Sequence, residues 1–182
     1  MMRGVVEDTT LDFAGVGGDG GVGGGTPGGR CQYEPKLNEG QAAQAEASIF
    51  VSIRANEVQQ QASRTYDSAG EVLPSGVALI LAAVGPLRED GIALDVGAGV
   101  GNILAQVALT TDVRDCVGVE LRSDLISLGQ YCMQQQIKHY SRLGKMLLKT
   151  VDVRDVSMST QPPICEVTIV FANITVLKKT QN

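Results

Sequence analysis

The segment IALDVGAGVGN, residues 92–102, decides the fold of this 182-residue chain. It passes directly from a short apolar strand, expected at 92–96, through a glycine loop to a helix expected at 102–109. Because glycine has no Cβ, a ligand can approach the loop backbone closely and meet the exposed N–H groups at the start of the helix. The segment therefore predicts a strand–loop–helix unit that binds a ligand.

The residues that follow repeat this alternation of strand and helix. We expect a strand at 117–120, a long helix at 124–143, and two further strands at 146–151 and 167–172. Strands that alternate with helices form βαβ units with a parallel sheet. The predicted fold class is therefore α/β, with a Rossmann-like parallel sheet and helices on both of its faces.

Upstream of this unit the composition changes twice. Residues 1–40 are rich in glycine and offer no apolar surface, so we expect a disordered tail. Residues 41–63 place Ala45, Ile49 and Ile53 on one stripe and predict a helix that packs on the following domain. That domain is expected at 64–174, followed by an unstructured tail at 175–182. Its first helix is expected to be short and heavily buried, opening on Pro74 and carrying five apolar residues: Val77, Leu79, Ile80, Leu81 and Val84.

The glycine spacing discriminates between ligands. A dinucleotide loop has the pattern G-x-G-x-x-G, but position 102 is Asn and the pattern here is D-x-G-x-G-x-G, with Asp95, Gly97, Gly99 and Gly101. An acid at the end of the first strand repels a pyrophosphate. It suits the ammonium and sulfonium groups of S-adenosylmethionine, which the sequence therefore predicts as cofactor; the alternatives are a nicotinamide-type fold and solvated strand-end charges.

Two more acids are expected at the carboxyl ends of neighbouring strands, where open α/β sheets bind ligands. Glu120 follows Asp95 by 25 residues, close to the roughly 20 expected of an acid that binds ribose hydroxyls. Asp152, followed by Val153, can reach an adenine amino group. For this third position Asp155 is an alternative, and neither acid need be involved.

Four motifs follow one another along the chain: Gly70-Glu71, the glycine loop at 94–102, Gly118-Val119-Glu120, and Val170-Phe171-Ala172-Asn173. In this order they resemble the disruptor-of-telomeric-silencing family, which methylates histone H3 on lysine-79 with a Rossmann-type class I fold and without a SET domain. The resemblance implies that Glu71 lies over the methionine moiety and that Asn173 stands at the mouth of the lysine channel as the catalytic residue. It also implies that Asp95, Gly97, Gly99 and Gly101 line the cofactor's amino-acid end, that Glu120 holds the ribose, and that Asp152 and Val153 flank the adenine.

The chain also departs from the family pattern. Ala69 stands where the family has Tyr, and Ile174 stands where a second Asn is expected. About four of the family's seven strands are supplied, so we expect an incomplete sheet and a C-terminally truncated version with little or no activity. The expected function is S-adenosylmethionine-dependent methylation of histone H3 in chromatin, in the nucleus. The alternatives are a cofactor-binding module without turnover and a small-molecule methyltransferase.

Composition limits the other classes of function. The formal net charge is −5, and no basic face predicts autonomous binding to nucleic acid. Residues 76–87, the longest apolar stretch, are too short to span a bilayer, and the four cysteines form no C-x-x-C pair that predicts a disulfide framework or a metal site. One basic group can be considered for contact with nucleosomal DNA, although a solvated charge cluster is the simpler interpretation: Lys138, Arg142, Lys145 and Lys149.

Overall fold

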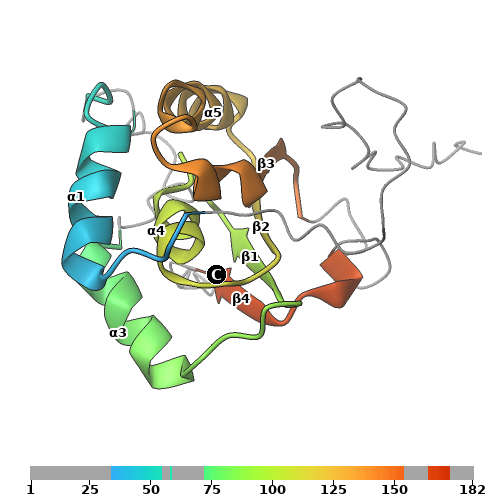
Figure 1. Cartoon of the computed structure of the whole chain (residues 1–182). Coiled ribbons are helices and arrows are strands. Elements are labelled where there is room, and N and C mark those ends of the chain that lie inside the picture. Colours follow the sequence, from blue (N-terminus) through green and yellow to red (C-terminus); the bar gives the residue numbers. More distant parts are fainter. Residues whose placement is uncertain (1–33, 55–57, 59–71, 154–163, 173–182) are drawn as a thin grey trace, which may run out of the picture.

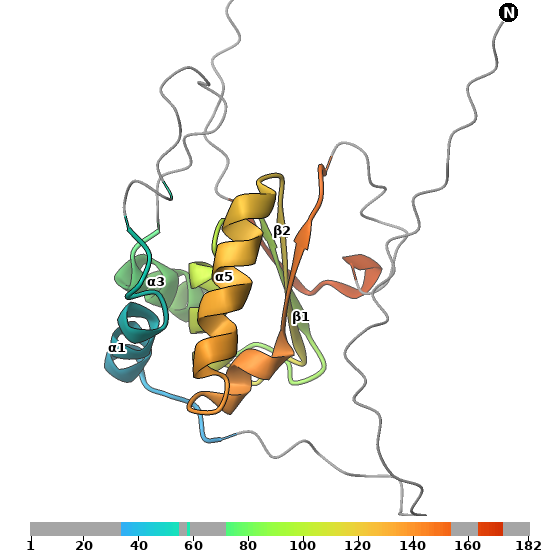
Figure 2. The same ribbon diagram turned by 90° about the horizontal axis from the view of Figure 1, so that it is seen from above.

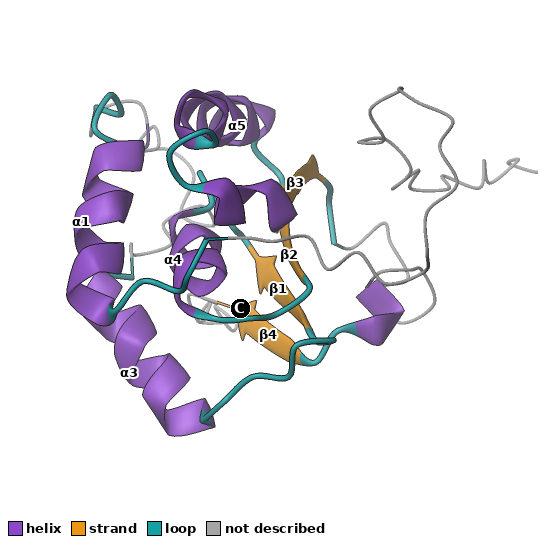
Figure 3. Ribbon diagram, viewed as in Figure 1, coloured by secondary structure: helices purple, strands orange, loops and turns teal. Residues whose placement is uncertain are grey.

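The computed structural model describes residues 34–54, 58, 72–153 and 164–172. Figure 1 shows the helices and the sheet in chain order, and Figure 3 shows the same view by type of element. The elements are α1 (Glu39–Ile49), α3 (Pro74–Val84), β1 (Ile92–Val96), α4 (Asn102–Thr110), β2 (Asp115–Glu120), α5 (Ser123–Gln136), the 3-10 helix η1 (Ser141–Lys145), β3 (Met146–Thr150), the 3-10 helix η2 (Ile164–Glu166) and β4 (Ile169–Ala172).

The described strands form a single parallel sheet in the order β3-β2-β1-β4. β1 lies inside the sheet, between β2 and β4, so the loop that follows β1 opens at the middle of the carboxyl edge. This arrangement confirms the predicted Rossmann-like α/β fold. It also confirms the strand at 92–96 and the helix that begins at Asn102.

The helices are distributed unequally over the two faces of the sheet. Seen from above, α1, α3 and α5 lie on one side of the strands and the short η2 lies on the other (Figure 2). The strand register determines which side chains contact the helices on each face, because residues that pair across parallel strands point to the same face. Ala93 belongs to the core beneath the helices, whereas Ile92 and Leu94 belong to a second core that includes Ile164 of η2.

α4 is the central helix of the domain. Residues 103–109 are all buried, because α4 packs on the sheet with one face and on α1 and α3 with another. A helix enclosed in this way is apolar around most of its circumference. α4 therefore fixes the distance between the glycine loop at its N-terminus and the outer helices.

Two predicted helices have different bounds in the structure. The helix expected at 124–143 is wrong beyond Gln136, where α5 ends and the His139 and Tyr140 N–H groups both donate to the Gln136 carbonyl oxygen. The chain then turns into η1 so that it can return to the start of β3. The helix expected at 41–63 begins earlier, at Glu39, and its described part ends at Ile49. Asn38 caps α1 by accepting a bond from the Gln41 N–H, and the tail expected at 1–40 is therefore ordered from residue 34 onward; residues 1–33 lie outside the described part.

The prediction that α3 is heavily buried is wrong. Val77 is its one buried residue, while Leu79 is 72% exposed and Val84 is 52% exposed. The reason is that α3 packs on α1 and α4 along one side only. The expected helix start at Pro74 and stop at Gly85 are both confirmed.

Candidate functional site

The glycine loop is held in a conformation that needs glycine. Gly97, Gly99 and Gly101 have φ angles of 80°, 56° and 89°, and within the described residues no other residue type has a positive φ. A Cβ built on Gly97 or Gly99 would meet nothing within 4 Å, so the side of the loop on which side chains would stand is open. This bare backbone is available to a ligand.

Backbone hydrogen bonds tie the loop to β2. The N–H groups of Gly97 and Ala98 both donate to the Val119 carbonyl oxygen, at 2.9 and 3.1 Å. Gly101 precedes α4 as its N-cap and provides no side-chain cap. The first-turn N–H groups of α4 therefore have no side-chain partner from the cap and point toward the loop.

Gly129 in the middle of α5 is part of the loop's support, and the sequence analysis missed it. A Cβ at this position would lie 2.2 Å from the Val100 carbonyl oxygen. Only glycine lets α5 approach the loop this closely. The sequence did contain a signal for this contact. A glycine inside a helix destabilises the helix, so its presence indicates that another part of the chain packs closely against it.

Asp95 lies beneath the loop at the end of β1. It is 1% exposed, and among the described residues neither carboxylate oxygen has a hydrogen-bond partner. Its neighbours across the sheet explain this, because Asp95 pairs with Gly118 on β2 and Phe171 on β4, which offer no side-chain donor. Burial, followed by the charge of Glu120, raises the pKa of Asp95 from 3.8 to about 7.

Glu120 ends β2 and reaches back to the loop. Its Oε2 accepts a bond from the Gly99 N–H at 3.0 Å, and its Oε1 accepts one from the Arg122 N–H at 3.0 Å. These two bonds fix the orientation of the carboxylate. Each oxygen keeps a further lone pair with which it can accept a ligand hydroxyl.

The third predicted position follows β3. The Val151 N–H donates to the Glu120 carbonyl oxygen at 2.9 Å, so the bonding to β2 continues to Val151, the residue before Asp152. Asp152 is half-buried and Val153 is exposed. Together with Asp95, Glu120 and the three loop glycines, they lie along one edge of the sheet. Glu71, Asn173 and Asp155 lie outside the described residues.

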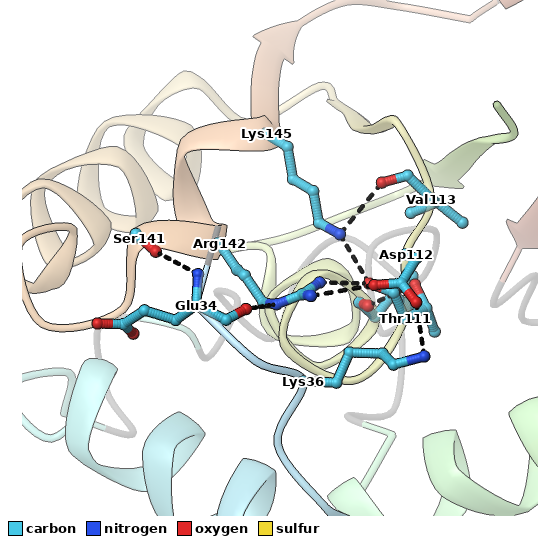
Figure 4. Close-up of polar contacts among 9 residues, drawn as sticks. Glu34, Lys36, Thr111, Asp112, Val113, Ser141, Arg142 and Lys145 are labelled. Carbon is cyan, nitrogen blue, oxygen red and sulfur yellow. Dashed lines mark hydrogen bonds and ion pairs between the residues drawn. The ribbon is translucent and has the colours of Figure 1, made fainter. Parts of the chain in front are cut away.

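A second polar cluster, missed by the sequence analysis, lies at the opposite end of α4 (Figure 4). Arg142 on η1 is 8% exposed and donates to the Glu34 and Thr111 carbonyl oxygens at 2.6 and 2.8 Å and to Asp112 Oδ1 at 3.0 Å. Asp112 also pairs with Lys36. These contacts fasten the segment before α1 to the end of α4.

Lys145 completes this cluster. Its Nζ donates to the carbonyl oxygens of Thr111 and Val113 at 2.8 and 3.1 Å, and burial lowers its pKa. A cation at the C-terminal end of a helix is favoured by the helix dipole. Arg142 and Lys145 are therefore buried helix-end contacts, and their expected place in a solvated charge cluster is wrong.

A hollow of about 350 Å³ lies near this end of α4 as well, lined in part by Lys36, Leu81, Leu87 and Gln106. None of the predicted cofactor residues lines it. Over the ranges that the structure describes, no three His, Cys, Asp or Glu side chains gather as metal ligands. Within the same ranges, no helix has both the length and the apolar character to cross a bilayer.

The site fits one class of cofactor. A central parallel strand, an open glycine loop, a buried acid without a partner and a second acid with free lone pairs define the class I methyltransferase fold, whose cofactor is S-adenosylmethionine. The family follows from a direct comparison. The model of the family "Histone methylation protein DOT1" matches residues 48–178, and the chain belongs to this family.

Two of the solved structures to which the chain is similar are named as methyltransferases. Phosphoethanolamine N-methyltransferase 2 of Haemonchus contortus is 19% identical with a TM-score of 0.42, over 54% of this chain and 20% of that one. Geranyl diphosphate C-methyltransferase of Streptomyces coelicolor A3(2) is 14% identical with a TM-score of 0.44, over 72% of this chain and 53% of that one. The chain thus spans about a fifth of the first and about half of the second. No curated protein sequence matches the chain.

Proposed function

We propose that the protein is a histone-lysine N-methyltransferase that transfers a methyl group from S-adenosylmethionine to histone H3 in the nucleosome, at the lysine-79 type of site, in the nucleus. The observation that carries the proposal is the buried, partnerless carboxylate of Asp95 beneath an open glycine loop, in a chain of the histone methylation family. A buried carboxylate without donors favours a cationic partner.

The described residues divide the work of holding the cofactor. Asp95 receives the ammonium group of its methionine end. The open space beside Gly97 and Gly99 admits its methionine end, and the first-turn N–H groups of α4 suit its carboxylate, since helix N-termini bind anions. Glu120, already oriented by the Gly99 and Arg122 N–H groups, accepts the ribose hydroxyls with its remaining lone pairs.

The other assigned residues extend this site at both ends. Asp152 and Val153 flank the adenine, next to Glu120 along the sheet edge. Glu71 covers the methionine moiety, and its neighbour Val72 accepts a long bond of 3.5 Å from Asn102 at the start of α4.

Asn173 is assigned to the mouth of the lysine channel. Ala172, the residue before it, pairs with Val96, the last residue of β1. This pairing brings the end of β4 level with the start of the glycine loop, which supports the assignment.

The cofactor supplies an activated methyl group on a sulfonium. The chain's contribution is to hold its groups so that a lysine amine meets the methyl along the sulfur–carbon axis, and alignment of this kind is worth up to about 7–11 kcal/mol. An apolar channel favours the neutral amine that this attack needs.

The test is transfer of labelled methyl groups to nucleosomes and to free histone H3 by the wild type, by Glu120→Ala, and by Glu89→Ala as a control at an exposed turn. The proposal expects labelling of H3, at the low level that the sequence predicts for this chain, which Glu120→Ala abolishes and Glu89→Ala preserves. Labelling should also disappear on nucleosomes in which the target lysine is replaced by arginine. If S-adenosylhomocysteine binds but no histone is labelled, the protein is a cofactor-binding module and the proposed activity is wrong.

A further inference from the structure

Asp95 and Glu120 face the same ligand site but are bonded very differently. Glu120 accepts two backbone N–H bonds, whereas neither oxygen of Asp95 accepts any. Bonds from N–H groups favour the charged form of a carboxylate, and burial without such bonds disfavours it. When the site holds one proton, the geometry therefore assigns this proton to Asp95.

No described cation is placed to reverse this assignment. α3 and α4 carry no charged residue, and Lys149 on β3 pairs with Val119, on the face of the sheet opposite to Asp95. Arg122 pairs with Asp124 at the start of α5, at 2.6 Å. Burial raises the pKa of Asp95 most, and the charged group that raises it further is Glu120, because its negative charge disfavours a second negative charge nearby.

We propose that Asp95 carries a proton in the cofactor-free protein and releases it when the cationic end of the cofactor enters, so that cofactor binding and proton release are a single coupled equilibrium. The inference rests on the cofactor site of the proposed function. The balance is simple: a neutral carboxylic acid meets an ammonium ion, an ion pair with a carboxylate forms, and one proton passes to the solvent.

The coupling has a measurable size. Because burial raises the pKa of Asp95 to about 7, binding should release close to one proton well below pH 7 and almost none well above it. Affinity for the cofactor then rises about tenfold from pH 6 to pH 8. The direction follows because only the ionised form of Asp95 attracts the ammonium group.

Titration calorimetry with S-adenosylhomocysteine tests this in buffers of different ionisation enthalpy at each pH, since the slope of heat against buffer enthalpy counts the protons released. Asp95→Asn should bind more weakly, release no proton and lose the pH dependence. Asp90→Asn, at an exposed ion pair with Arg88, should keep the wild-type proton release. Binding by the wild type without proton release overturns the inference and leaves the proposed function intact.

A second measurement does not need the cofactor. Carbon-13 NMR titration of the aspartate carboxyls, with Asp95→Asn used to assign the signal, should show Asp95 titrating near pH 7 in the free protein. Titration of this signal below about pH 5, as for an ordinary aspartate, overturns the inference even if the chain fails to bind S-adenosylhomocysteine. A lack of binding with a titration near pH 7 would instead refute the cofactor site of the proposed function, and the coupling with it.

Discussion

The contact between Gly129 and the glycine loop makes a sharp prediction for the substitution Gly129→Ala. In an ordinary helix interior, alanine is more stable than glycine by about 1 kcal/mol. Here the new Cβ would lie 2.2 Å from the Val100 carbonyl oxygen and 2.8 Å from its carbon, so α5 or the loop must move by about 1 Å. Overpacking of this kind costs about 1–3 kcal/mol, and we expect a net loss of stability.

The assay is denaturant unfolding of the wild type, Gly129→Ala and the control Gly40→Ala. Gly40 also lies in a helix, α1, but its Cβ would meet only Asn38 Oδ1, at an ordinary 3.6 Å. The control should be neutral or gain up to about 1 kcal/mol. Because the displaced segment is the ligand loop, Gly129→Ala should also weaken binding of S-adenosylhomocysteine. A Gly129→Ala protein as stable as Gly40→Ala, with unchanged affinity, would refute the packing argument.

Three further predictions concern charged residues. Burial raises the pKa of Asp95 in the folded state to about 7. The protonated carboxyl therefore stabilises the folded state fully below about pH 4, and this stabilisation is lost as pH rises through 7. In urea unfolding from pH 4 to 8, the wild type should lose about 4 kcal/mol of unfolding free energy relative to Asp95→Asn. Arg142→Ala removes the donor of the Glu34 carbonyl oxygen and one of two donors each from the Thr111 carbonyl oxygen, which keeps Lys145, and from Asp112, which keeps Lys36. It should cost about 1–3 kcal/mol, whereas Lys138→Ala, at an exposed position, should stay within about 0.5 kcal/mol. Thermal unfolding of both variants separates the buried cluster from a solvated one. Glu120→Ala should weaken S-adenosylhomocysteine binding by about 1.5–3 kcal/mol in calorimetry, since it removes a charged acceptor of ribose hydroxyls; equal affinity would exclude Glu120 from the site.

Local patterns in the sequence were sufficient for the fold and for the edge of the sheet at which the candidate site lies. Alternating strand and helix signals allow few topologies, because parallel strands need crossovers and align their carboxyl ends. The acids at the ends of β1 and β2 therefore had to lie at one edge, and the glycine pattern at 97–101 had to follow the strand expected at 92–96. The positive φ angles of all three loop glycines agree with this prediction.

Charges and helix ends were less predictable, because they depend on partners that are distant in the chain. Lys138 and Arg142 are four residues apart and carry the same charge, yet Lys138 is exposed and Arg142 is buried against Glu34, 108 residues away. The end of α5 at Gln136 likewise depends on where the chain must return to begin β3. Sequence periodicity contains no information about either distance.

The sequence by itself predicted which residues lie at the ligand edge of the sheet, because the alternation of strand and helix makes the strands parallel and brings their carboxyl ends to one edge. Only the tertiary structure decided how each of these residues behaves chemically. Asp95 and Glu120 are both acids at strand ends, but Glu120 has two N–H donors and Asp95 has none, because its neighbours across the sheet are Gly118 and Phe171. Solvation and hydrogen bonding set the charge of a carboxyl group, and both are properties of the packed fold.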